Sequence, residues 1–184
     1  MKVISMINQK GGVGKTTSTY NIAVLLARKY RVLMIDSDSQ ASLTLMTANN
    51  PLALDYSLAD VYSGNKNIED CIYQLPIDNL SLISSNLSLA KLETTLMAVP
   101  FGRETKLEKA LKRIEEQFDY VIVDAPPLGL VIDAVIIGQC TDGTVVVIEQ
   151  GVIKRKLVQD VIKQLKRGGI RILGAVLNKV DDRV

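Results

Sequence analysis

The stretch KGGVGKT, residues 10 to 16, decides the fold, because a glycine-rich run ending in Gly-Lys-Thr is the pattern of a loop that cradles phosphate. The general form of that loop, G-x-x-x-x-G-K-[ST], has glycine at the position that Gln9 occupies here. The chain also places a second lysine, Lys10, at the mouth of the run. The sequence around the run distinguishes a phosphate loop from a glycine turn with incidental lysines.

The run lies between an apolar segment and a segment with helical periodicity. Val3–Ile7 predicts a buried strand, and Thr16–Lys29 predicts a helix with an apolar face that can pack against a sheet. In this setting backbone N–H groups and the helix N-terminus converge on a phosphate. Lys15 is then expected to reach the β- and γ-phosphates, and the Thr16 hydroxyl to ligate magnesium. The predicted nucleotide-binding residues of the loop are Gly11, Gly12, Val13, Gly14, Lys15, Thr16 and Thr17.

Along the rest of the chain, short β-rich runs alternate with helical periodicity. Further strands are expected at Val32–Ile35, Leu80–Ile83, Tyr120–Val123, Thr144–Ile148 and Ile172–Leu177. Further helices are expected at Leu87–Met97, Thr105–Gln117 and Lys154–Lys166, with short helices in the turn-rich stretch Asn49–Asn79. This alternation predicts a doubly wound α/β fold, with a mainly parallel sheet covered by helices on both faces, as a single domain over residues 1–184.

Composition excludes several classes of protein and site. The 184 residues include no histidine, which excludes His metal sites and His general bases. The two cysteines, Cys71 and Cys140, have neither metal-ligand nor redox spacing, which favours a reducing compartment and predicts a cytoplasmic location. No segment reaches ~18 uninterrupted apolar residues, so no membrane span is expected. The formal net charge of +2 indicates no particular partner.

Two acidic motifs follow predicted strands. In DSDSQ, residues 36–40, Asp36 and Asp38 come at the carboxyl end of Val32–Ile35, where ligands bind in open α/β sheets. In FDYVIVDAPP, residues 118–127, an apolar strand ends in Asp124, a carboxylate that is costly to bury unless it meets a cation. The alternative for Asp36 and Asp38 is a capping or turn cluster at the end of a strand.

Together these motifs resemble those of the ParA/MinD family of ATPases. There K-G-G-x-G-K-T is the deviant Walker A motif, and the resemblance implies that its extra lysine, Lys10, reaches the partner's nucleotide across an ATP-dependent homodimer. A cation at the loop mouth can neutralise γ-phosphate charge on an opposing subunit, as an arginine finger does. The alternative for Lys10 is that it only supplements the local positive field.

The acidic motifs gain roles from the same resemblance. DSDSQ is similar to the family's D-x-D-P-Q, with Ser39 in place of proline, and implies that Asp38 orients the attacking water while Asp36 lies behind the magnesium. VDAPP is similar to the Walker B segment, D-x-P-P, and implies that Asp124 holds magnesium through water. The implied catalytic residues are Lys10, Lys15 and Asp38, and the implied metal-site residues are Thr16, Asp36 and Asp124.

Two branches of the family compete as the nearest likeness. Residues 1–127 resemble ParA-like partition ATPases, whereas the C-terminal third looks more like the tyrosine-kinase module of bacterial capsule-synthesis regulators. Kinase modules usually lack the extra lysine and end in a tyrosine cluster, whereas the six tyrosines here are scattered, with none after Tyr120. The preferred hypothesis is a partition ATPase that binds Mg-ATP, hydrolyses it slowly and works with DNA and a partition adaptor protein. The alternatives are the kinase module and a nucleotide-binding scaffold without catalysis.

The end of the sequence contains a motif that indicates which base is bound. Partition ATPases usually continue through further elements that complete the pocket, and no MinD-like amphipathic membrane anchor is evident before Val184. N-K-V-D, residues 178–181, matches the guanine-reading N-K-x-D of GTPases, but the family resemblance implies that Asn178 contacts adenine, so ATP is favoured over GTP.

The predicted helix Lys154–Lys166 has a charged face of one sign. Between Gly151 and Arg171 there are seven basic residues and a single acid, Asp160. At ~100° per residue, five of the basic side chains gather opposite an apolar face, which consists of Ile153, Leu157, Val158, Val161, Ile162 and Leu165. A stripe of one sign suits phosphate backbones without reading sequence, and the alternative is an ordinary solvated face. The predicted DNA-binding residues are Arg155, Lys156, Lys163, Lys166 and Arg167.

Overall fold

A computed structural model describes residues 1–8, 10–96, 102–126 and 137–181, which form a seven-stranded sheet in the order β3-β4-β2-β5-β1-β6-β7. The strands are β1 (Lys2–Ile7), β2 (Val32–Asp36), β3 (Ile72–Gln74), β4 (Leu80–Ile83), β5 (Tyr120–Asp124), β6 (Gly143–Glu149) and β7 (Ile172–Asn178). Neighbouring strands run parallel, except that β3 is antiparallel to β4. The predicted mainly parallel α/β class is confirmed.

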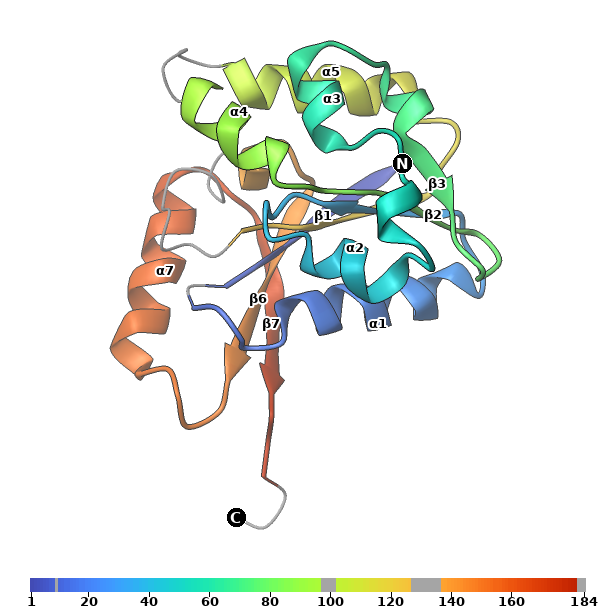
Figure 1. Cartoon of the computed structure of the whole chain (residues 1–184). Coiled ribbons are helices and arrows are strands. Elements are labelled where there is room, and N and C mark those ends of the chain that lie inside the picture. Colours follow the sequence, from blue (N-terminus) through green and yellow to red (C-terminus); the bar gives the residue numbers. More distant parts are fainter. Residues whose placement is uncertain (9, 97–101, 127–136, 182–184) are drawn as a thin grey trace.

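Helices cover both faces of this sheet (Figure 1). One face carries α1 (Lys15–Ala27) and α2 (Ser42–Thr47), and the other carries α3 (Leu58–Ser63), α4 (Ser88–Leu96), α5 (Gly102–Arg113) and α7 (Arg155–Arg167). Short 3-10 turns lie at Pro51–Ala53 and Ile68–Cys71. Alternate residues of β2 enter opposite layers: Leu33 and Ile35 join the α3–α5 core, whereas Val32 and Met34 join the α1 core. Burial on both faces explains why the strands are continuous apolar runs.

Several predicted boundaries were wrong, and two elements were not predicted. The expected helix Thr105–Gln117 begins earlier, at Gly102. It ends at Arg113, because the N–H groups of Ile114 and Gln117 bond to carbonyl groups three residues back and the chain tightens into turns. The segments β3 and α2 have three and six residues, too short to show a period. Gln9, Met97 and Pro127 lie outside the described residues.

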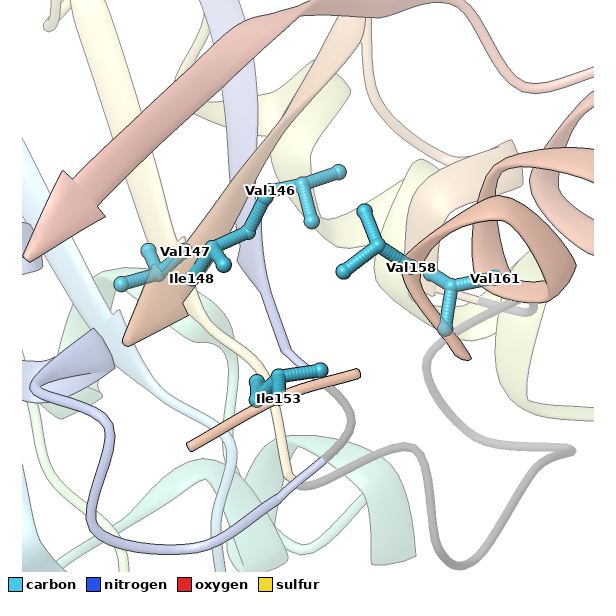
Figure 2. A pocket seen from close by; sticks show the side chains of 6 residues that line it. All are labelled: Val146, Val147, Ile148, Ile153, Val158 and Val161. Carbon is cyan, nitrogen blue, oxygen red and sulfur yellow. The ribbon is translucent and has the colours of Figure 1, made fainter. Parts of the chain in front are cut away.

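α7 packs on β6 through a narrow apolar stripe. Val158 and Val161 face β6 across a hollow of only about 10 Å³ (Figure 2). Leu165, at i+7 from Val158, is fully buried in the same core as Val161. Leu157, predicted on the apolar face, is 39% exposed because it lies one position off this stripe. The five basic side chains predicted on the opposite face are all exposed. No described helix has the length and apolar character needed to cross a bilayer.

Candidate functional site

The strand register brings the two acidic motifs and the glycine loop to one edge of the sheet. Asp124 of β5 pairs with Met6 of β1 on one side and with Asp36 of β2 on the other. Because these strands are parallel, their carboxyl ends meet at the same edge, and α1 begins there. A cavity of about 380 Å³ at this edge is lined by Asn8, Gly11, Gly12, Gly14, Lys15, Thr16, Thr17, Asp38, Gln40 and Ser42.

The glycine loop has a backbone that suits an anion. Gly12 and Gly14 adopt φ values of +79° and +88°, a region that costs other residues energy. Gly14 is the N-cap of α1 and supplies no side-chain cap, so the amides of the first helical turn are available to a ligand. Val13 is fully buried and holds the loop against the core, while Gly11 and Gly12 are exposed. The loop therefore fits the phosphate cradle expected from the sequence.

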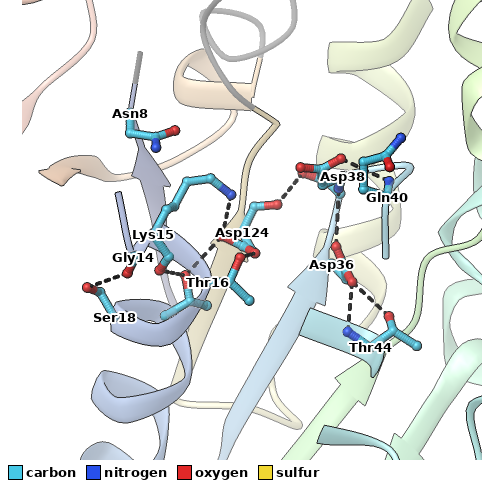
Figure 3. Close-up of polar contacts among 12 residues, drawn as sticks. Asn8, Gly14, Lys15, Thr16, Ser18, Asp36, Asp38, Gln40, Thr44 and Asp124 are labelled. Carbon is cyan, nitrogen blue, oxygen red and sulfur yellow. Dashed lines mark hydrogen bonds and ion pairs between the residues drawn. The ribbon is translucent and has the colours of Figure 1, made fainter. Parts of the chain in front are cut away.

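A buried ion pair lies beneath the loop (Figure 3). The Asp124 carboxylate is fully buried and accepts from Lys15 Nζ at 2.6 Å, Thr16 Oγ1 at 2.7 Å and Thr19 Oγ1 at 3.1 Å. The Lys15 side chain is only 6% exposed. The cation that a buried carboxylate requires is therefore the ammonium of Lys15 in this structure. Thr19 was not predicted, although it lies one turn after Thr16 on the same side of α1.

The donor set is compatible with magnesium. Thr16 Oγ1 and Asp124 Oδ2 lie 2.7 Å apart, so a single cation site can include both. Magnesium is usually held by one or two carboxylates together with substrate phosphates, not by a cage of protein ligands. The described residues contain no group of three or more Cys, Asp or Glu side chains arranged to hold a metal ion.

Asp36 is fully buried and is bonded to α2. Its carboxylate accepts from the backbone N–H and the hydroxyl of Thr44, both at 2.8 Å, and from the Asp38 N–H at 3.2 Å. Burial raises the pKa of Asp36 to about 6, the Thr44 and Asp38 donors oppose the rise, and the nearby Asp124 charge adds to it. Asp36 therefore fixes the turn that carries Asp38. No motif pointed to Thr44, because its contact depends on how α2 folds back.

Asp38 and Lys10 lie at the open side of the cavity. Asp38 is partly exposed and accepts a hydrogen bond from the Gln40 N–H at 2.9 Å. This is the turn role that the sequence analysis gave as the alternative for Asp38. Asp38 also lines the cavity, so it can still contact a ligand. Lys10 is exposed, and its ammonium makes no hydrogen bond or ion pair with any described residue.

Asn8, which the motifs did not single out, joins β1 to the loop. Its side-chain amide donates to the Lys10 carbonyl, and the side chain is 2% exposed. Its side-chain oxygen is buried and finds no hydrogen-bond partner in the described part of the chain. Figure 3 shows Asn8 at the end of β1, on the same side of the sheet as Lys15. Its position directly before the loop is the only sequence feature that could have indicated it.

Asn178, predicted as a base contact, does come to the loop from the end of β7. Its side-chain amide donates to the Val13 carbonyl at 2.9 Å, so the contact present is with the loop backbone. The next residue, Lys179, donates from Nζ to the Gly12 carbonyl at 3.1 Å. Lys179 was part of the N-K-V-D match but had no predicted role.

Comparison with known proteins gives relatives over the whole chain. The AAA domain family model matches residues 1–169. Tyrosine-protein kinase CpsD of Streptococcus agalactiae is 33% identical over 184 residues, which is 100% of this chain and 77% of CpsD. The sporulation initiation inhibitor protein Soj of Bacillus subtilis is 35% identical over 131 residues, which is 70% of this chain and 51% of Soj. A solved structure of cobyrinic acid a,c-diamide synthase from Mycobacterium smegmatis, with bound ATP analogue and magnesium, has a TM-score of 0.89 at 28% identity and covers 100% of this chain and 77% of its own.

Proposed function

The chain belongs to the ParA/MinD family of P-loop ATPases, and from this premise we propose that it binds Mg-ATP, hydrolyses it slowly and works as an ATP-dependent dimerisation switch in DNA partition. The observation that carries the proposal is the contrast between the two loop lysines. Lys15 is buried against Asp124, whereas Lys10 is exposed at the mouth with a free ammonium among the described residues. A cation in that position is available to a second subunit.

The residues for binding Mg-ATP lie in the loop after β1, at the start of α1, and at the carboxyl ends of β5 and β7. The loop amides and Lys15 bind the β- and γ-phosphates, and Thr16 and Asp124 hold the metal, which when bound neutralises charge on the phosphates. The M. smegmatis structure with an ATP analogue and magnesium supports this assignment, since it shares the fold over the entire chain. We expect Asn178 to contact adenine with the part of its amide that Val13 leaves unused.

Hydrolysis needs a group that orients water at the phosphate. Asp38 lines the cavity and is partly exposed, so its second carboxylate oxygen can accept a hydrogen bond from water. Asp36 acts behind it, by holding Asp38 and α2 in place. This division between the two aspartates is the reason to expect turnover that depends on Asp38.

The decisive experiment measures nucleotide binding and dimerisation separately. Calorimetry with magnesium gives the affinity for ATP and GTP, and analytical ultracentrifugation with ATP or ADP gives the subunit stoichiometry. Lys10→Ala is expected to abolish the ATP-dependent dimer while monomer affinity changes little. Lys29→Ala, which removes an exposed lysine just after the other end of α1, is the matched control and is expected to dimerise normally.

Three outcomes would count against this proposal. Tighter binding of GTP than of ATP would overturn the base assignment. Dimerisation that survives Lys10→Ala would remove the role of Lys10. Binding of ATP with neither dimerisation nor turnover would indicate a nucleotide-binding scaffold instead of a switch.

A kinase module is the second candidate, favoured by the 33% identity to CpsD along the whole chain. It predicts transfer of the γ-phosphoryl group to tyrosine. Incubation with labelled ATP, followed by phosphotyrosine detection, separates the two functions. Stoichiometric label on tyrosine would replace the partition hypothesis, whereas release of phosphate without labelled protein would support it.

DNA binding is proposed for the exposed basic face of α7. Its five basic side chains are all exposed, and the only acid between Gly151 and Arg171, Asp160, gives little compensation. A dimer would double this stripe, so we expect binding of random duplex DNA that requires ATP and weakens steeply with salt.

A mobility shift over a salt series tests the DNA proposal. Lys163→Glu with Lys166→Glu is expected to remove binding, whereas Lys109→Glu with Lys112→Glu, an equal charge change on α5, is expected to have a much smaller effect. Binding that is indifferent to the α7 changes, or no binding at low salt, would refute it.

A further inference from the structure

Side chains at the end of β7 donate hydrogen bonds to the backbone of the glycine loop. Asn178 Nδ2 donates to the Val13 carbonyl at 2.9 Å, and Lys179 Nζ donates to the Gly12 carbonyl at 3.1 Å. The Lys179 ammonium is itself fixed by Glu149 at the end of β6, at 2.8 Å, and the Glu149 side chain is only 16% exposed. Two consecutive residues of one strand end therefore bind two consecutive carbonyl groups of the loop.

The fit between loop and strand end is close. A Cβ atom added to Gly14 would lie 2.1 Å from Asn178 Nδ2, so the Asn178 amide occupies the space that any other residue at position 14 would need. Gly14 also has φ +88°, a backbone conformation that costs other residues energy, so the backbone itself favours glycine here. The close approach shows how tightly the end of β7 packs on the loop.

These contacts address a cost that every glycine-rich phosphate loop carries. To bind an anion, successive N–H groups must point inward, which turns carbonyl groups outward, where they need partners. Glycine has the largest freedom to lose, so ordering the loop on binding weakens affinity. Hydrogen bonds that order the loop before the ligand arrives reduce this cost.

We propose that Asn178 and Lys179 are positioning residues that hold the Gly12–Val13 carbonyls and keep the loop in its phosphate-binding shape, so that they set affinity for the polyphosphate independently of the base. This inference rests on the proposed binding of ATP at the same loop. It differs from the adenine contact of Asn178, which acts on the base alone and involves no role for Lys179.

Two measurements on the full chain separate the possibilities. The first is the NMR order parameter of the backbone amides of residues 11–14 without any ligand, and the second is calorimetry with magnesium and either ATP or inorganic tripolyphosphate, which has no base. For Asn178→Ala and Lys179→Met we expect lower order parameters in the loop. We also expect ATP and tripolyphosphate affinities to fall by the same factor, about fivefold to tenfold, as for one lost hydrogen bond.

Further variants keep the test interpretable. Glu149→Gln keeps the hydrogen bonds to the loop but removes the ion pair that holds the Lys179 ammonium, and is expected to shift the order parameters and the affinity in the same direction by a smaller factor. Asn65→Ala and Lys109→Met, at exposed positions away from the loop, are the matched controls and should change neither. Far-UV circular dichroism and urea midpoints establish that each variant is folded.

The outcomes distinguish this inference from the function on which it rests. Unchanged order parameters of the loop in both variants would overturn the positioning role. A loss of ATP affinity with tripolyphosphate affinity intact would assign Asn178 to the base alone and also overturn it. Failure of the wild-type chain to bind either ligand would refute the proposed function itself, whereas failure of the positioning role leaves wild-type binding intact.

Discussion

Replacing Asp124 with asparagine would leave the Lys15 ammonium without its anion while keeping the shape of the side chain. In the ligand-free protein the pair is 2.6 Å apart, with exposed fractions of 6% for Lys15 and 0% for Asp124. Both groups are therefore largely removed from water. The effect on folding stability follows from which charge remains and how well it can be solvated.

The two single variants should differ in magnitude. Removing one partner of a buried pair costs about 3–5 kcal/mol. Lys15→Met leaves the carboxylate fully buried and should lower the free energy of unfolding by about that amount. Asp124→Asn leaves an ammonium beside the 380 Å³ cavity, where water can reach it, so a smaller loss of about 2–3 kcal/mol is expected. Against a typical total of about 5–15 kcal/mol, both losses are large.

Urea unfolding followed by far-UV circular dichroism, without nucleotide and with EDTA, measures these losses. With a slope of about 2 kcal/mol per molar, the midpoint should fall by about 1–1.5 M for Asp124→Asn and by about 1.5–2.5 M for Lys15→Met. The double variant should lose less than the sum, because no unpaired charge remains. Glu108→Gln, which breaks the exposed α5 pair with Lys112, is the control and should barely move the midpoint.

Additive single effects, or an Asp124→Asn midpoint within experimental error of wild type, would refute the reasoning. Additive effects would mean that the pair carries no coupling energy. An unchanged midpoint would mean that water already solvates the Lys15 ammonium. The inverse order, with Asp124→Asn much worse than Lys15→Met, would show that the cavity does not admit water.

Three further perturbations have defined outcomes. Burial raises the pKa of Asp36 from 3.8 to about 6, above its value in the unfolded chain. The stability that the protonated side chain contributes is therefore full below pH 4 and is lost as the pH rises through 6. Asp36→Asn should remove that decline in urea unfolding measured from pH 4 to 7.5. Burial raises the pKa of the Cys71 thiol to about 11, so at pH 7.5 a thiol reagent should label the partly exposed Cys140 first, and equal rates by mass spectrometry would contradict the burial of Cys71. Ser57 forms a capping box with Asp60 at the start of α3, and Ser57→Ala should cost about 1 kcal/mol in the same unfolding assay, an unchanged midpoint arguing against the cap.

Local patterns were enough to predict six of the seven strands and the loop. KGGVGKT carries its own chemistry over seven residues, and long apolar runs such as β5 are recognisable because both sides of a central strand are buried. Asp124 could be assigned to a cation from burial alone, since an unpaired carboxylate is too costly at the end of such a strand. The identity of that cation, Lys15, required the register between β1 and β5.

Contacts between distant segments could not be predicted in this way. Thr44 binds Asp36 eight residues away only because α2 folds back on β2, and six residues give no measurable period. Lys179 meets Gly12 across 167 residues, a contact that depends on β7 lying beside β6. The single-sign stripe on α7 was visible in the sequence, but the exposure of Leu157 depended on where the helix touches the sheet.

The Thr44 hydroxyl lies at the rim of the sheet, between segments that belong to the two helical layers. It donates to Asp36 and accepts the Ser85 N–H at 2.9 Å, so one oxygen atom joins the end of β2 to the segment after β4. The adjacent Ser84 carbonyl in turn accepts the Leu58 N–H at 2.9 Å, at the start of α3 on the opposite face. A rearrangement of α2 that withdrew this oxygen would leave the Asp36 carboxylate without a donor and the Ser85 N–H without an acceptor, so the rim of the sheet, not its interior, is where a shift of α2 would first be felt.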